Sequence, residues 1–420
     1  MESNKNTTSG EKQYPNGNIY NGEMINDLRE GKGILIRKKT SLFIAELKQA
    51  IENKNIIFYC AEKEASKKKF PTKKLNGIEL FFYEGDKYEG EFNNDKINGK
   101  GIMTWDNGNK YEGEFKNNFF EGEGKLTFAS KSYYQGQFVE GMQMGKGIFS
   151  YSNGDMYNGD WKNGVKEGKG TYKYHNGDKY IGDWKSDYKE GQGICIYGNK
   201  DKYEGGWKKN MREGKGIYTY NNGEKYEGDW SKDMKDGNGE FKYKNGDVYT
   251  GEWKKDKHNG HGVLVSTNGN KYEGEWKNNK KEGEGIFYNR NGRYEGEFKN
   301  DMREGKGTIY YNNGNIYDGY FKDNKKDGKG IFYFKSGNRY EGDFKNDKRE
   351  GSGIMYYETN KYREMGNYLN DKKVGIHVIL YTDGKSEIKN YDEEIHENDK
   401  NSIHEEKKEN DIIDDNLNEK

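Results

Sequence analysis

The stretch YEGEFKNNFFEGEGKLTF, residues 111–128, contains the pattern that decides the fold. In its first part, aromatic residues and glycine alternate with glutamates, and a period of two is typical of a β-strand. After a polar middle, a second alternating segment opens with a Gly-x-Gly pair. Two short alternating segments joined by polar residues predict a β-hairpin. Its aromatic and glycine positions are Tyr111, Gly113, Phe115, Gly122 and Gly124.

This hairpin pattern repeats along the chain. A tyrosine followed two residues later by glycine recurs at a step of 23 from Tyr88 to Tyr272, and then at Tyr294 after a step of 22. An earlier copy begins at Tyr20, and a decayed copy centres on Gly366. Counting both ends, the sequence contains about 14 repeats. The other tyrosines of the series are Tyr111, Tyr134, Tyr157, Tyr180, Tyr203, Tyr226, Tyr249, Tyr317 and Tyr340.

Glycine and aromatic residues share one side of each expected strand. In one repeat the residues of this parity are Gly168, Gly170, Tyr172 and Tyr174. A ring that lies flat over the backbone of a strand glycine compensates for the missing side chain. One face of the sheet is therefore predicted to be aromatic, and the other to carry Glu and Asp beside residues such as Ile217 and Thr219. Further aromatic and glycine positions are Tyr180, Gly182, Trp184, Gly191, Gly193, Tyr226, Gly228 and Trp230.

Asn-Gly pairs separate the repeats. Asn107-Gly108 and Asn245-Gly246 predict tight turns, because both residue types tolerate positive φ. Successive hairpins would then join into one antiparallel meander. We expect an all-β fold, an elongated single-layer antiparallel sheet of about 28 strands, with a short helical insertion near the N-terminus.

The composition excludes several classes of protein. A mean hydropathy of -1.35 and 34% charged residues suggest disorder, but 59 glycines and 36 tyrosines indicate a thin aromatic layer instead. The formal net charge is zero, which gives no case for nucleic-acid binding. Only Cys60 and Cys195 are present, so no disulfide framework is expected. With no signal peptide and no apolar span long enough for a membrane, we expect a cytoplasmic protein that touches membranes only peripherally.

The stretch 111–128, and the related YEGDWSKDMKDGNGEFKYKNGDVY at 226–249, resemble the MORN (membrane occupation and recognition nexus) repeat. The resemblance covers about residues 14–36 and 76–390. It implies a β-meander, often a homodimer, that scaffolds protein complexes where membranes meet the cytoskeleton. Binding of acidic phospholipids is also associated with the family. Some relatives carry a lipid kinase or methyltransferase domain. No segment outside these repeats is long enough for one, so we expect no catalytic residues, no cofactor and no metal.

The pattern divides the chain into six parts. The regular array is bounded by an interrupted first repeat and by a degenerate last repeat, and both termini are expected to be disordered. The parts are residues 1–13, the disordered N-terminus; 14–36, the interrupted first repeat; 37–75, a basic insertion; 76–361, the regular array; 362–390, a degenerate capping repeat; and 391–420, an acidic disordered tail.

The insertion combines a predicted helix with positive charge. Phe43, Leu47, Ala50 and Ile51 fall at helical spacing after the potential N-cap Ser41. One interpretation is that the helix covers the N-terminal edge strand. Another is that the insertion binds an anionic membrane or a partner. The lysines that would make this contact are Lys38, Lys39, Lys67, Lys68, Lys69, Lys73 and Lys74.

Other candidate sites are weaker. His258 and His261 are three residues apart at a hairpin turn without a third ligand nearby, which disfavours a zinc site. Cys195 has the aromatic parity and is expected to be buried and inert. Lysines near one hairpin edge are predicted either to face phospholipid head groups or to discourage aggregation. These are Lys254, Lys255, Lys257, Lys277, Lys280, Lys281, Lys322, Lys325 and Lys326.

The leading functional prediction is a non-enzymatic cytoplasmic scaffold, expected to dimerise, at a membrane–cytoskeleton boundary. Two alternatives stay open. The chain would be a phosphoinositide-binding peripheral membrane module, with the basic insertion as its contact, or a regulatory subunit of a separate lipid kinase.

Overall fold

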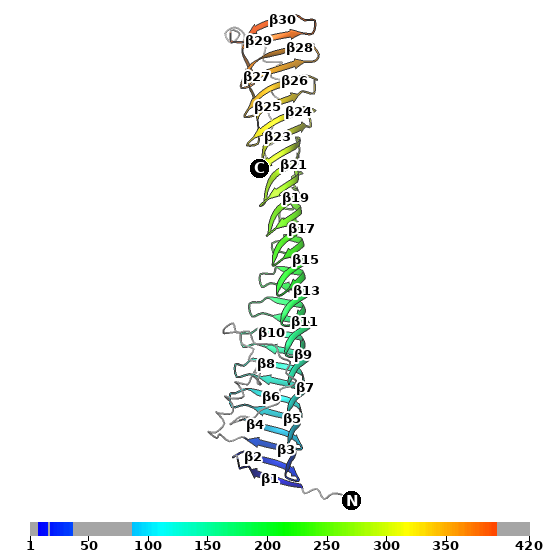
Figure 1. The fold of residues 1–420 in the computed structure, drawn as a ribbon, viewed down its shortest axis with the longest axis vertical. Helices are drawn as coiled ribbons and strands as arrows, with labels where there is room; N and C mark the ends of the chain where they lie inside the picture. The colour runs from blue at the N-terminus through cyan, green and yellow to red at the C-terminus, as the bar shows by residue number, and fades with distance from the viewer. Residues whose placement is uncertain (1–6, 16, 37–85, 393–420) are drawn as a thin grey trace. The chain divides into compact units, whose positions relative to one another are not determined.

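A computed structural model describes residues 7–15, 17–36 and 86–392, which form thirty strands and no helix. The chain divides into two compact units, residues 1–211 and 212–420. Within each unit every strand pairs antiparallel with the next strand in sequence, and Figure 1 shows the strands following one another in chain order. The predicted all-β antiparallel meander is confirmed.

The first unit contains the strands β1 to β14. Their bounds are β1 Thr7–Gln13, β2 Ile19–Ile25, β3 Leu28–Ile36, β4 Lys87–Asn93, β5 Lys96–Thr104, β6 Lys110–Lys116, β7 Phe119–Thr127, β8 Tyr133–Val139, β9 Met142–Ser150, β10 Met156–Lys162, β11 Val165–Lys173, β12 Lys179–Lys185, β13 Tyr188–Ile196 and β14 Lys202–Lys208.

The second unit contains the remaining strands, of which β15 begins at the boundary. Their bounds are β15 Met211–Thr219, β16 Lys225–Ser231, β17 Met234–Lys242, β18 Val248–Lys254, β19 Lys257–Val265, β20 Lys271–Lys277, β21 Lys280–Asn289, β22 Gly292–Lys299, β23 Met302–Tyr311, β24 Ile316–Lys322, β25 Lys325–Tyr333, β26 Arg339–Lys345, β27 Lys348–Tyr357, β28 Tyr362–Leu369, β29 Lys372–Tyr381 and β30 Ser386–Asn390.

The sheet continues across the basic insertion. β3 pairs with β4 in the regular register, with Gly33 opposite Gly90 and Ile36 opposite Lys87. The insertion therefore stands in place of one turn between two neighbouring strands. The predicted helix and the seven lysines of the insertion lie outside the described residues.

The predicted ends of the array need correction. Residues 7–13, expected to be disordered, form β1, which pairs with β2 from Thr7↔Ile25 onward. At the other end, Tyr391 and Asp392 were assigned to the acidic tail, but the main-chain N–H of Tyr391 donates to the carbonyl of Gly375. Both errors arise because a terminal strand has too few residues to show the period.

Two kinds of turn alternate along the chain. The first kind joins the two strands of one repeat. An example is Asn117 and Asn118, whose φ angles of 49° and 70° make a two-residue turn of type I′. In the predicted Asn-Gly turn only Gly108, with φ of 86°, has positive φ. The predicted turn is present, closed by the bond from the Gly108 N–H to the Trp105 carbonyl, and this longer loop needs one left-handed residue only.

A bulge recurs along the array between the two strands of a hairpin. Gly159 lies opposite Gly170, but the next aligned pair is Trp161 and Lys166, so the register shifts in between. Within the bulge Gly168 has a φ of 75°, and a side chain there would meet Asp160 on the polar face. In the ladder with β12, Gly168 lies opposite Trp184, in line with Gly170 as predicted, but its left-handed backbone would direct a side chain toward the polar face.

The second glycine of the pair does lie beneath an aromatic ring. A side chain at Gly170 would collide with the ring of Tyr157, which is fully buried. The Tyr157 hydroxyl donates to the carbonyl of Asp160 at 3.0 Å, a group that the bulge leaves outside the strand ladder. Thirteen repeats contain this bond from a tyrosine to the third residue after it.

Rings connect each repeat to the next. The Tyr157 ring makes edge-to-face contacts with Trp161 of its own repeat and Trp184 of the following one, both at 5.2 Å. Such pairs each contribute about 0.5–1.5 kcal/mol beyond the area they bury. The indole Nε1 of Trp184 also donates to the Gly170 carbonyl at 3.3 Å. The core is therefore one layer of rings in which every repeat depends on its neighbours.

Turns also bind the preceding repeat. The main-chain N–H of Ser186 donates to Glu167, and Asp187 accepts from the N–H of Lys166 at 3.0 Å. At the opposite side of the sheet, Asp155 accepts from the N–H of His175 in the next repeat at 2.8 Å. The recurring Glu, Asp and Asn residues thus satisfy turn backbone groups.

The last repeat ends the array by exchanging two residue types. Glu364 stands where the other repeats have tyrosine, and His377 stands where they have the second glycine. The His377 ring fills the space above Gly366, and its Nδ1 lies 3.1 Å from Glu364. Lys373 and Tyr391 complete the cluster at 3.0 and 2.8 Å from the same carboxylate. Burial alone would raise the pKa of Glu364, but hydrogen bonds from His377 and the charge of Lys373 lower it to about 2.

We expect Gly193→Ala to lower the free energy of unfolding of the first unit by about 3 kcal/mol, because its methyl group would overlap the Tyr180 ring. The matched control is Gly177→Ala in a turn, where the methyl group meets only ordinary contact and the left-handed strain costs about 1–2 kcal/mol. Urea denaturation measures both. Equal losses would show that the space beneath the ring is not the constraint.

We further expect Glu364→Tyr and His377→Gly each to destabilise the second unit by about 3 kcal/mol, since each leaves buried charge without its partner. The double variant restores the regular tyrosine and glycine, and should unfold within about 1 kcal/mol of the wild type. Additive losses in this thermal-denaturation cycle would contradict the exchange described for the cap.

Candidate interaction surfaces

The aromatic face carries a row of basic residues that the sequence did not predict. They follow the two-residue turn in ten repeats, and they share the parity of the second glycine and of the rings on the same strand. We call them the aromatic-face cations: Arg29, Lys166, Lys189, Arg212, Lys235, Lys281, Arg303, Lys326, Arg349 and Lys373. A recurring Lys or Arg before the Glu-Gly or Asp-Gly pair could have predicted these cations, but we expected such residues to be charged residues of exposed loops.

Lys166 shows how such a cation is held. Its Nζ lies 5.5 Å from the Trp184 ring and 3.0 Å from the Asp187 carboxylate in the next repeat's turn. Cation–π contact and an ion pair together offset part of the cost of desolvating the ammonium group. The row therefore joins neighbouring repeats.

A groove on the aromatic face of the second unit is lined by Lys235, His258, Lys281 and Arg303, together with Trp253 and Trp276. Burial lowers the pKa of Lys235 and of Lys281. The rim of the groove carries turn carboxylates such as Asp256 and Asp301. Cations and anions alternate here, so the groove has no single sign of charge.

His258 replaces the cation in its repeat. Its ring stacks on Tyr249 with 3.6 Å between centroids, as Phe120 stacks on Tyr111 at 3.7 Å. Nε2 lies 3.0 Å from the Tyr243 hydroxyl, while Nδ1 has no hydrogen-bond partner among the described residues. Burial, with a smaller effect of the Lys235 charge, lowers the pKa of His258 to about 4.

The two histidines at which a zinc site was disfavoured do not share a face. His258 lies among the rings, whereas His261 is exposed on the polar face opposite Glu275. The described part of the chain contains no group of three His, Cys, Asp or Glu residues placed to hold a metal. Cys195 is buried between Tyr180 and Tyr203, as predicted.

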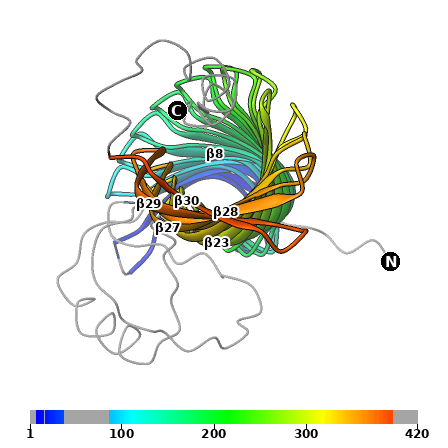
Figure 2. The same cartoon turned by 90° about the horizontal axis from the view of Figure 1, so that it is seen from above.

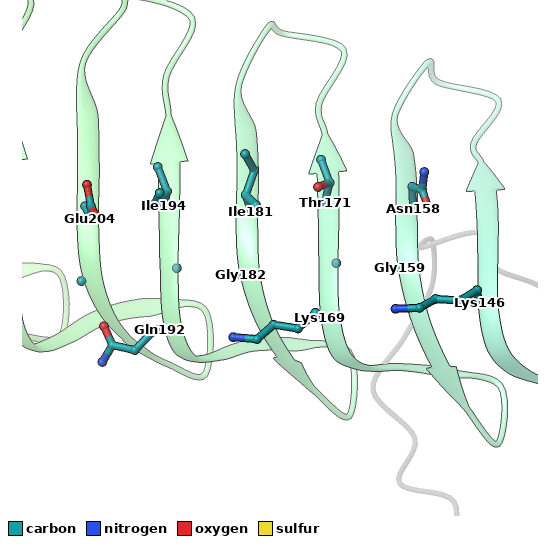
Figure 3. Close-up of a pocket in the computed structure, with 13 residues that line it drawn as sticks. Lys146, Asn158, Gly159, Lys169, Thr171, Ile181, Gly182, Gln192, Ile194 and Glu204 are labelled. Atoms are coloured by element: carbon teal, nitrogen blue, oxygen red, sulfur yellow. The ribbon is translucent and has the colours of Figure 1, made fainter.

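The polar face of the first unit contains a shallow groove, shown in Figure 3. Its floor is the backbone of glycine pairs such as Gly182 and Gly193. One side is a row of side chains that Figure 3 shows standing in line: Asn158, Thr171, Ile181, Ile194 and Glu204, of which Glu204 is charged. The other side consists of Lys146, Lys169 and Gln192, of which Lys146 pairs with Asp160 and Lys169 with Asp183.

The predicted lysine stripe is only partly on the surface. Lys326 is buried, and with Lys281 it belongs to the aromatic-face cations. The others remain exposed at the hairpin end: Lys254, Lys255, Lys257, Lys277, Lys280, Lys322 and Lys325. Among the residues that the structure describes, no helix is long and apolar enough to span a membrane.

The folded state lowers the pKa of His258 to about 4, so the unfolded chain binds the proton first as the pH is lowered. The free energy of unfolding should therefore decrease as the pH is lowered from about 6.5 to about 4. The loss is about 3 kcal/mol at most. His258→Phe, which copies Phe120, should remove this part of the pH dependence of unfolding. The exposed His261→Phe is the matched control, and equal pH profiles for both variants would contradict the assignment.

Comparisons with known proteins find weak similarity to solved structures and none to curated proteins. A search of curated proteins found no match to the chain. Among solved structures, the TCP domain of Drosophila melanogaster SAS-4 in complex with a proline-rich motif of Ana2 is 15% identical, with a TM-score of 0.25, covering 42% of this chain and 90% of that one. The TCP10 domain of Danio rerio CPAP in complex with a STIL peptide is 10% identical, with a TM-score of 0.15 and coverage of 69% and 99%. Similarity at this level says nothing about a ligand of this chain.

The family model for the MORN repeat matches thirteen times, at residues 20–39, 88–110, 111–133, 134–156, 157–179, 180–202, 203–225, 226–248, 249–271, 272–292, 294–316, 317–339 and 340–361. The decayed copy around Gly366 is not matched, although β28 and β29 form its hairpin. These matches cover well over half of the sequence, and the chain belongs to the MORN-repeat family.

Proposed function

We propose that this protein is a non-enzymatic scaffold that organises proteins of a membrane- or cytoskeleton-associated complex. One observation carries the proposal. The polar groups that recur along the array are already used inside the fold: the Tyr157 hydroxyl donates to a carbonyl, the Trp184 indole donates to a carbonyl, and the Glu167 carboxylate accepts from a turn N–H. Chemistry that repeats in this way supports a framework rather than a catalytic centre.

The residues that differ between repeats support the same conclusion. On the polar face the position after the repeat tyrosine is Asn158, Ile181 and Glu204 in three consecutive repeats, and all three line one groove. A constant framework therefore presents a changing series of exposed side chains. Such a surface suits the binding of several partners along one chain. Dimerisation and contact with acidic phospholipids remain expectations from the family, for light scattering and liposome sedimentation to test.

We expect the tagged endogenous protein to concentrate in a ring, cap or cortical pattern in dividing cells, because a scaffold takes the location of its complex. Fluorescence imaging with proximity labelling would measure the pattern and identify neighbours. Gly193→Ala at the same expression level is the control for an intact array. A diffuse cytosolic signal for the wild type would contradict the proposal.

A further inference from the structure

Four hairpins of the second unit end in lysines that face each other. The two residues that flank a two-residue turn are directly opposite across the strands, and in these hairpins both are lysine. We call them the lysine pairs: Lys254 with Lys257, Lys277 with Lys280, Lys322 with Lys325, and Lys345 with Lys348.

Opposed lysines are unfavourable for the hairpin itself. Residues directly opposite in an antiparallel pair have Cβ atoms about 4.5–5.5 Å apart, and like charges at this position destabilise the sheet. All eight side chains are exposed, and within the described residues none forms an ion pair with a carboxylate. The fold therefore does not account for the second lysine of each pair.

The repeat does not require two lysines at this place. In the first unit the same positions pair Lys116 with Phe119, Lys162 with Val165, and Lys185 with Tyr188. Protection of a strand edge does not explain the pairs either, because the end of a hairpin exposes no unpaired ladder.

Nearby carboxylates are directed elsewhere. Asp256 and Asp347 lie in the turns between paired lysines, and each accepts a main-chain N–H from the preceding repeat. Lys235 donates to Asp256 at 2.9 Å, and Lys326 donates to Asp347 at 2.8 Å. Asp256 and Asp347 are thus committed to the framework. The third turn carboxylate, Asp323, forms no ion pair with Lys322 or Lys325 among the described residues. Of the paired lysines, Lys280 donates to the amide oxygen of Asn300 at 3.3 Å, and none is held by a carboxylate.

Spacing and twist decide between a membrane and a polypeptide. Successive repeats add two strands, so equivalent residues lie about 10 Å apart. Adjacent strands rotate by about 20–25°, so each repeat turns the hairpin end by about 40–50°. Figure 2 shows this fanning of the strands in the second unit. From Lys254 to Lys345 there are four repeat steps, and a flat lipid surface cannot meet all four pairs, whereas a flexible chain of anions can follow them.

We propose that the lysine pairs bind an extended acidic segment of a partner polypeptide. This inference rests on the proposed scaffold function and names one class of partner for it. Four steps of about 10 Å correspond to at least about 12 extended residues. The segment would meet successive pairs about every third position, with one interval of about six where the intervening repeat has Lys299 opposite Met302.

The test uses the full chain and a fluorescein-labelled oligoglutamate of about 12 residues, with fluorescence anisotropy as the readout. Replacing one lysine of each pair (Lys254→Gln, Lys277→Gln, Lys322→Gln and Lys345→Gln together) removes four charges without creating new ion pairs. We expect the Kd to rise about tenfold or more, and wild-type binding to weaken steeply with salt.

The matched control removes four lysines from the same repeat position in the first unit: Lys116→Gln, Lys162→Gln, Lys185→Gln and Lys208→Gln together. It should keep the wild-type Kd within about twofold. Equal weakening in both variants, or no binding by the wild type, would overturn the proposal.

Phosphatidylcholine vesicles containing phosphatidylserine form the second arm of the test. Vesicle binding that needs the lysine pairs, without peptide binding, would assign the pairs to a membrane instead. A scaffold that fails to localise in cells would leave the peptide result unchanged, so the two failures are distinguishable.

Discussion

The tyrosine ring over a facing pair of glycines is the constraint on which the rest of the structure depends. Gly159 and Gly170 lie opposite each other, and a side chain on either would enter the space of Tyr157. The hydroxyl of that ring reaches a carbonyl that only the bulge exposes. The ring, the glycines and the bulge therefore depend on one another: the glycines make room for the ring, and the bulge places a carbonyl within reach of its hydroxyl.

Much of this was predictable because it depends on residue type and spacing alone. The period of 23, the strand alternation and the pairing of ring with glycine all follow from a single repeat. The left-handed φ of Gly168 did not follow, because a bulge leaves no mark in a pattern of period two. Lys166 has the same parity as Gly170, so its place on the aromatic face could have been predicted from the alternation. The role of Glu167 was also hidden, since its partner Ser186 belongs to the next repeat's turn.

The C-terminal cap shows how a repeating core can stop. In earlier repeats an aromatic ring of the following repeat lies under the cation. At the end of the array the Tyr391 ring takes this place, 5.2 Å from Nζ of Lys373. Glu364 and His377 replace an apolar stack by a buried ionic cluster. Such clusters add little net stability but are specific about their partners. The exchange thus closes the core with groups that a further regular repeat would not match.

The pairing of Ile36 with Lys87 has a consequence for how such chains change during evolution. The closure entropy of a loop grows only with the logarithm of its length, so residues 37–86 cost about 2 kcal/mol more than a five-residue turn in the same place. Every Asn-Gly turn offers the same arrangement of two strand ends held side by side. The MORN repeat should therefore tolerate insertions at any of these turns. A new segment could then be acquired at one turn while the strands on either side keep their pairing.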